Sequence, residues 1–136
     1  LSSLPPPPHT SQIRDILEMI NGDTKAQATY HWELYDNCSY PRFHKEAHTS
    51  VPVATFASEF HEYAVERSST HIKYAVDGNV IITISKDQEP DLQLWPMPFY
   101  LILNTAVGGP WPGPPSSQTV FPTYHTIDYV RVAHRS

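Results

Sequence analysis

The sequence predicts an all-β fold, an antiparallel β-sandwich made of short strands. Several alternating or β-branched runs are separated by turn signals, the clearest of which is Asp77-Gly78. The 14 prolines gather at 5–8, 90–98 and 110–122, which are expected to be loops. No segment has the apolar spacing of a long helix. Short strands between frequent turns are typical of a sandwich.

Size and charge narrow the function classes. A chain of 136 residues suits one domain with a real core. The net charge is −5 and no basic stripe is visible, so nucleic acid is not an expected partner. No apolar run approaches the ~18 residues of a membrane span, so no membrane partner is expected. Cys38 is the only cysteine, which leaves no intrachain disulfide.

The first elements are predicted in chain order. Residues 1–11 form a proline-rich leader without the features of a signal peptide, and 12–136 form the domain. Residues 12–20 fit either a strand or a short helix. The turn Asn21-Gly22-Asp23 then precedes an alternating run, 26–32, which is expected to pair back as a strand. The polar residues 36–52 are expected to be a loop.

The middle of the chain carries the clearest β signal. Residues 59–66 and 71–76 are short β-rich runs. Asp77-Gly78 predicts a hairpin turn because both residue types tolerate positive φ. The return strand is expected at 80–84.

The last third is predicted to contain two more strands. Residues 99–107 are almost continuously apolar, so a strand buried on both faces is expected there. Residues 108–122, rich in glycine and proline, form the following loop. Residues 126–133 are expected to close the sheet as a final strand.

Two carboxylates, Asp15 and Glu18, stand in an otherwise apolar run. Acidic residues at such places are costly unless they are paired or functional. Same-face residues in a regular strand are two apart, so these two share a face only if a β-bulge lies between them. The same-face neighbour of Asp15 is position 13, where Ile13 stands. A carboxylate there would complete an acidic row suited to glycoside hydrolysis.

The chain resembles glycoside hydrolase family 16, the laminarinase and endo-β-1,3(4)-glucanase group. Five runs carry the resemblance in the family's order: Asp15-Ile16-Leu17-Glu18-Met19-Ile20-Asn21-Gly22, Thr29-Tyr30-His31-Trp32, 60–66 with Val76-Asp77-Gly78, 98–109 with Trp111-Pro112-Gly113, and 128–132. The resemblance covers residues 12–134 and matches the C-terminal part of the family's domain. It implies a jelly-roll, concanavalin-A-like sandwich that is truncated on its N-terminal side.

The resemblance also implies roles for the two acids. Glu18 matches the acid/base and Asp15 the assisting carboxylate, while Ile13 occupies the nucleophile position. The alternatives are purely structural roles: Glu18 could form an ion pair with Arg14 or a lysine, and Asp15 could accept local hydrogen bonds.

Four further residues match the family's substrate cleft. His31 and Trp32 would hydrogen-bond and stack a sugar, and Trp111 would stack from its loop. Asn104 would brace or contact the cleft floor. Each has a structural alternative, such as a satisfied histidine, a tryptophan covering the core edge or a purely bracing asparagine.

No metal or organic cofactor is predicted. His44 and His48 have the i, i+4 spacing of a helical zinc pair, but their surroundings indicate a loop and no further ligand fits. Asp128 matches a position that can contribute to a structural calcium site in the family, and no ion is predicted here.

Three functions remain open. The first is a β-glucan-binding protein that is impaired in hydrolysis because of Ile13. The second is an active retaining endo-β-1,3(4)-glucanase. This function requires that the sequence is incomplete or misread around Ile13, or that Gln12 marks a shifted register. The third is an interaction or defence protein without a glycan role, in which a second copy covers exposed strand edges. Secretion is implied by the resemblance alone.

Overall fold

The computed structural model describes residues 12–20, 25–33, 44–53, 58–90, 92, 94 and 99–134, with side chains except at 12–15, 32–33 and 44–48. The chain divides into two compact units, Leu1–Met97 and Pro98–Ser136. The predicted leader, the turn at 21–23 and Cys38 lie outside the described residues. No helix in the described residues is long and apolar enough to cross a bilayer.

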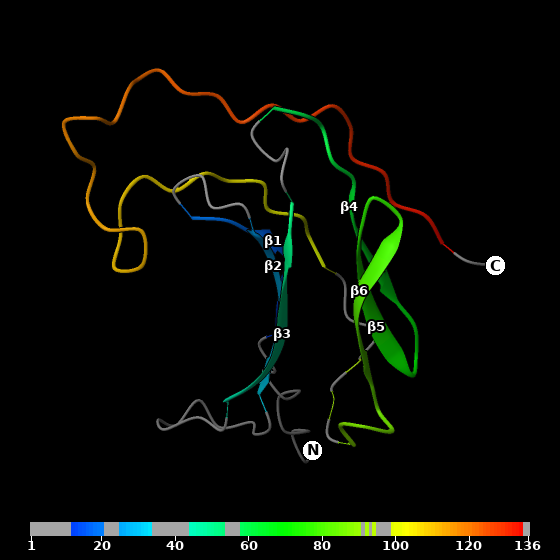
Figure 1. The fold of residues 1–136 in the computed structure, drawn as a ribbon. Coiled ribbons are helices and arrows are strands. Elements are labelled where there is room, and N and C mark those ends of the chain that lie inside the picture. Colours follow the sequence, from blue (N-terminus) through cyan, green and yellow to red (C-terminus); the bar gives the residue numbers. More distant parts are fainter. Residues whose placement is uncertain are drawn as a thin grey trace, which may run out of the picture. The chain divides into compact units, whose positions relative to one another are not determined.

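In its described part, the first unit holds two three-stranded antiparallel sheets. The first sheet has the order β1 (Gln12–Glu18), β2 (Lys25–Glu33), β3 (His44–Pro52). The second sheet has the order β4 (Tyr63–Arg67), β5 (His71–Val76), β6 (Asn79–Ser85). Figure 1 shows the two sheets face to face. The predicted antiparallel sandwich is therefore confirmed, and the ambiguous run 12–20 begins as a strand.

A buried apolar cluster lies between the sheets. We call it the main core cluster; its members are Ala28, Tyr30, Ile72, Tyr74, Ile84, Leu92 and Leu94. Burial alternates along β5, where Ile72, Tyr74 and Val76 are buried and their neighbours are half-buried. A period of two is expected when one face of a strand packs on a core. A smaller cluster of Ala26, Val53 and Val76 extends this interior.

The hairpin between β5 and β6 forms where the sequence predicts it. Val76 pairs with Asn79, which leaves Asp77 and Gly78 as a two-residue loop. Their φ angles are 50° and 77°, the positive values that this kind of turn requires. The Asp77 carboxylate also accepts a hydrogen bond from the Glu62 amide at 2.9 Å and lies 2.8 Å from Nδ1 of His61. These contacts tie the hairpin to the segment before β4.

The prediction of a loop over 36–52 is wrong for its second half. Residues 44–52 form β3, which pairs with β2 along its whole length, from Lys25↔Pro52 to Glu33↔His44. An antiparallel strand can keep one face in solvent, so a polar composition does not prevent pairing. Val51 packs against the smaller apolar cluster and supplies part of the inward contact.

The two strands predicted in the second unit are absent from its described residues. Residues 99–107 and 126–133 follow an irregular path there. Their apolar side chains are exposed rather than buried, for example Ile102 at 67% and Val132 at 76%. A strand exists only when a neighbour accepts and donates its backbone hydrogen bonds, and neither segment has such a ladder. The predicted loop 108–122 is a loop, with turns closed by bonds such as Gly113 N–H to Gly109 C=O at 3.0 Å.

Candidate functional site

A β-bulge separates the two acidic residues of β1. Asp15 pairs with Thr29 and Glu18 pairs with Gln27, so three steps on β1 match two steps on β2. The extra residue restores a common face to residues that a regular strand would place on opposite faces. The condition under which Asp15 and Glu18 could act together is therefore met.

Position 13 lies on the same face as the two acids. Ile13 pairs with His31, two positions along β2 from Thr29. The pairing continues to β3, where Gln27 is opposite Ser50 and Thr29 is opposite His48. We call this side of the first sheet the outer face; its positions are 13, 15, 18, 25, 27, 29, 31, 46, 48, 50 and 52.

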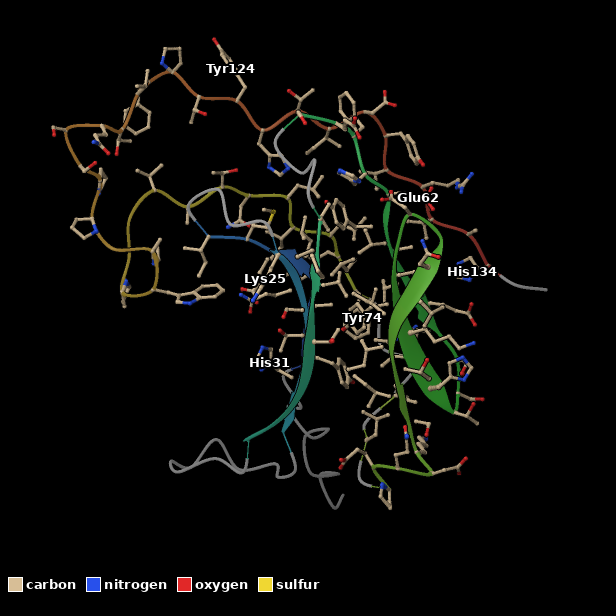
Figure 2. All side chains as sticks on the ribbon, viewed as in Figure 1. Lys25, His31, Glu62, Tyr74, Tyr124 and His134 are labelled. Atoms are coloured by element: carbon tan, nitrogen blue, oxygen red, sulfur yellow. The ribbon has the colours of Figure 1, made fainter. Side chains whose placement is uncertain are left out.

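The sequence of β2 explains why this face is polar. Ala26, Ala28 and Tyr30 alternate with Gln27, Thr29 and His31; the first three are almost fully buried, Gln27 and His31 are half-buried, and Thr29 is buried. Figure 2 shows Lys25 and His31 on the side of the first sheet away from Tyr74, which lies between the sheets. Ala28 and Tyr30 are buried in the main core cluster. Their burial fixes the register that places Gln27, Thr29 and His31 on the outer face.

The site residues expected from the sequence do not all gather here. His31 is half-buried on the outer face, opposite position 13. Trp32 is the next residue along β2, so its position belongs to the opposite face together with Tyr30. Asn104 and Trp111 belong to the second unit, where both are exposed, Trp111 at 56%.

Several residues of the outer face were not among the site residues expected from the sequence. Gln27, Thr29 and Ser50 lie beside Glu18 and His31 in the register. Glu18 and Gln27 are half-buried, and Thr29 is only 7% exposed. The alternation of polar and apolar residues in β2 is the signal that could have identified Gln27 and Thr29. Ser50 carried no signal because β3 was expected to be a loop.

The opposite side of β2 receives a polar contact from the second sheet. The Tyr74 hydroxyl donates a buried hydrogen bond of 3.2 Å to the backbone carbonyl of Thr29. Thr29 is the residue paired with Asp15 at the start of the bulge. The backbone beneath the acidic row is therefore linked to β5 through the core.

The pKa values of two residues around the hairpin of the second sheet are shifted. The hydrogen bonds from His61 and from the Glu62 amide lower the pKa of Asp77. Burial, helped by the charge of Asp77, raises the pKa of Tyr63 to about 12. Among the side chains that the structure describes, no three His, Cys, Asp or Glu residues form a group that could hold a metal ion.

Comparison with known proteins identifies the scaffold. The model of glycosyl hydrolases family 16 matches residues 14–131, so Ile13 lies one position before the match. A beta-glucanase of Rhodothermus marinus is 38% identical over 90 residues, which cover 61% of this chain and 32% of the relative. The clotting factor G alpha subunit of Tachypleus tridentatus is 29% identical over 126 residues, covering 92% of this chain and 18% of the relative.

A solved structure supports the same conclusion. The laminarinase catalytic domain from Thermotoga maritima MSB8 superposes with a TM-score of 0.66 at 30% identity, over 81% of this chain and 45% of the laminarinase chain. The chain thus spans less than half the length of each of these three relatives. The jelly-roll type of sandwich expected from the sequence is confirmed by this match. With 118 of its 136 residues inside the family match, this chain belongs to glycosyl hydrolases family 16.

Proposed function

We propose that this chain binds β-glucan on the outer face of its first sheet and is impaired in glycoside hydrolysis. The observation that carries the proposal is the register of β1 on β2. It aligns positions 13, 15 and 18 opposite 31, 29 and 27. This alignment supports the proposal because the family resemblance expects a nucleophile at position 13, where the sequence has isoleucine.

The chemistry of retention explains the impairment. A retaining glycosidase needs one carboxyl group as acid/base and a second, about 5–5.5 Å away, to attack the anomeric carbon. Ile13 has no lone pair to form the glycosyl-enzyme bond. Glu18 can still donate a proton to a glycosidic oxygen, and Asp15 can assist it, but neither group replaces the missing nucleophile.

Binding does not require the nucleophile. Sugar hydroxyls are bound by side chains that both donate and accept hydrogen bonds, and Glu18, Gln27 and His31 supply such groups on one face. Trp32, whose position belongs to the opposite face of β2, and Asn104 and Trp111, which belong to the second unit, are not part of this proposed site. The substrate class is supported by the beta-glucanase and laminarinase relatives, and secretion is proposed on the same basis.

Titration calorimetry with laminari-oligosaccharides tests the binding half of the proposal. We expect heat of binding for the unaltered chain and at least a severalfold weaker affinity for His31→Ala. His71→Ala is the matched control, because His71 is also a half-buried strand histidine but belongs to the second sheet. The absence of heat at millimolar ligand, or equal losses for both variants, would contradict binding on the outer face.

Release of reducing sugar from laminarin tests the hydrolytic half. The unaltered chain should release none above background, and Ile13→Glu should gain activity because it adds a carboxylate in line with Asp15 and Glu18. Ile13→Gln is the control of equal size without a nucleophilic oxygen. Release by the unaltered chain would instead establish the active retaining endo-β-1,3(4)-glucanase.

Exposed apolar residues of the second unit support a second candidate, self-association. Large apolar side chains exposed by more than half include Tyr100, Ile102, Val107, Phe121 and Val132. Large exposed apolar patches mark interaction surfaces in soluble proteins, and these side chains could supply one. Light scattering over a concentration series should then give the mass of a dimer or larger, and a mass of 15.4 kDa at high concentration would exclude it.

A further inference from the structure

The side chain of Tyr74 carries a buried hydroxyl that is not needed to fill the core. Tyr74 is 1% exposed in the main core cluster, and its polar atom must find a partner there because an unpaired buried hydroxyl is costly. A phenylalanine would fill the same volume without that requirement. The partner it finds is the Thr29 carbonyl, 3.2 Å away and 45 residues earlier in the chain.

The acceptor of this hydrogen bond, Thr29, lies next to the β-bulge. Thr29 lies on the middle strand of the first sheet and pairs with Asp15, the last regular pair before the bulge. The next regular pair is Glu18 with Gln27. A bulge interrupts the ladder locally, so the strand opposite it has less support from its neighbour at that point. The hydrogen bond from Tyr74 reaches β2 at this point from the side of the core.

The same cluster also contacts the bulge itself. Ile16, one of the two residues between Asp15 and Glu18, packs against the main core cluster, of which Tyr74 is a member. Tyr74 thus belongs to the packing that supports the bulged segment of β1 and also bonds to the strand opposite it. Both contacts lie at the bulge that sets the alignment of positions 15 and 18.

We propose that Tyr74 is a positioning residue for the acidic row on the outer face, acting through the Thr29 carbonyl. This proposal rests on the proposed function of that face as a β-glucan site. Tyr74 does not touch the ligand; it holds the β2 backbone so that the bulge keeps Asp15 and Glu18 on a common face. Removing the hydroxyl loosens the register there while the ring continues to fill the core.

The test compares Tyr74→Phe with Tyr63→Phe in the full chain. Tyr63 is a half-buried tyrosine of the second sheet that packs on the smaller cluster instead of the main core cluster. Three quantities are measured: amide hydrogen exchange along both sheets, the midpoint of the Glu18 carboxyl titration by carbon-13 NMR, and affinity for laminari-oligosaccharides by calorimetry.

For Tyr74→Phe we expect faster exchange, by about tenfold, confined to 15–18 and 27–29, as expected for the loss of one buried hydrogen bond. The Glu18 midpoint should move, because the coupling of two carboxyls depends on their separation. Affinity should fall about 3- to 10-fold for the same reason. Tyr63→Phe should change none of the three.

The outcomes separate this proposal from the proposed function. Unchanged exchange at the bulge, or exchange that rises uniformly through both sheets, overturns the positioning role. A Glu18 midpoint that stays in place also overturns it, because the proposal requires the alignment of positions 15 and 18 to change when the hydroxyl is removed. If the unaltered chain binds no glucan, the proposed function fails, while local exchange and the shifted midpoint still support Tyr74 as the residue that positions the acids.

Discussion

Two segments of this chain have the opposite structure to the one that their composition predicts. The strand β3 is polar and contains two histidines and a lysine, yet it pairs with β2 over nine residues. Residues 99–107 are apolar and β-branched, yet they form no strand in the described structure and expose Tyr100 at 83%. A strand is therefore decided by the neighbour that satisfies its backbone and by the face it can bury, more than by its own propensity.

The comparison can be tested most strongly by truncating one isoleucine in each region. Ile72 is fully buried in the main core cluster, and Ile72→Ala should cost about 2–5 kcal/mol of unfolding free energy through lost burial and a cavity. Ile102 is 67% exposed, and Ile102→Ala should stay within about 0.5 kcal/mol. Urea unfolding measures both. Equal losses would mean that residues 99–107 are packed in solution.

A smaller effect is expected from glycines with positive φ in the two regions. Gly78 has a φ of 77° and open space where a Cβ would be, so Gly78→Ala should cost about 1–2 kcal/mol through backbone strain alone. Gly108 has a similar φ of 76° but lies outside any sheet. Gly108→Ala should leave the unfolding midpoint of the sandwich unchanged. A shift for both would show that the two units unfold together.

Acid should weaken the hairpin by a smaller amount. The pKa of Asp77 is lowered in the folded chain by His61 and the Glu62 amide, so its contribution is complete above the unfolded pKa of about 3.9 and disappears as the pH falls through the folded value. The carboxylate is half-exposed, which limits the effect by solvent screening.

Urea midpoints measured from pH 6 down to pH 2 should therefore decline less steeply for Asp77→Asn than for the unaltered chain. Asp87→Asn is the control, because Asp87 is an exposed aspartate in the turn after β6. If Asp77→Asn declines as steeply as the unaltered chain, the contact with His61 does not stabilise the hairpin.

The smallest effect is expected from raising the β propensity of β3. Ser50 is exposed on the outer face, opposite Gln27. Ser50→Val should change the unfolding free energy by no more than about 0.5 kcal/mol, since pairing with β2 already specifies the strand. Thermal unfolding measures the shift. A gain well above this amount would mean that propensity limits β3 after all.

Local chemistry explains which elements were predictable. Asp77-Gly78 predicts its hairpin because few residue types accept positive φ. The strands β2 and β5 are predictable because buried residues alternate with polar or half-buried ones, as with Ala28 and Tyr30 around Thr29. Neither β3 nor the irregular path of 99–107 has a comparable local signal, because each depends on contacts with another part of the chain.

The sequence by itself determined the family, the all-β class and the presence of Ile13, Asp15 and Glu18 in one short run, since all three follow from residue identity and order. Only the tertiary structure decided that Asp15 and Glu18 share a face, because a bulge is a property of two paired strands. The same pairing separated His31 from Trp32 and placed Thr29 above the hydroxyl of Tyr74. Register and contacts through the core join residues distant in sequence, and no local pattern encodes them.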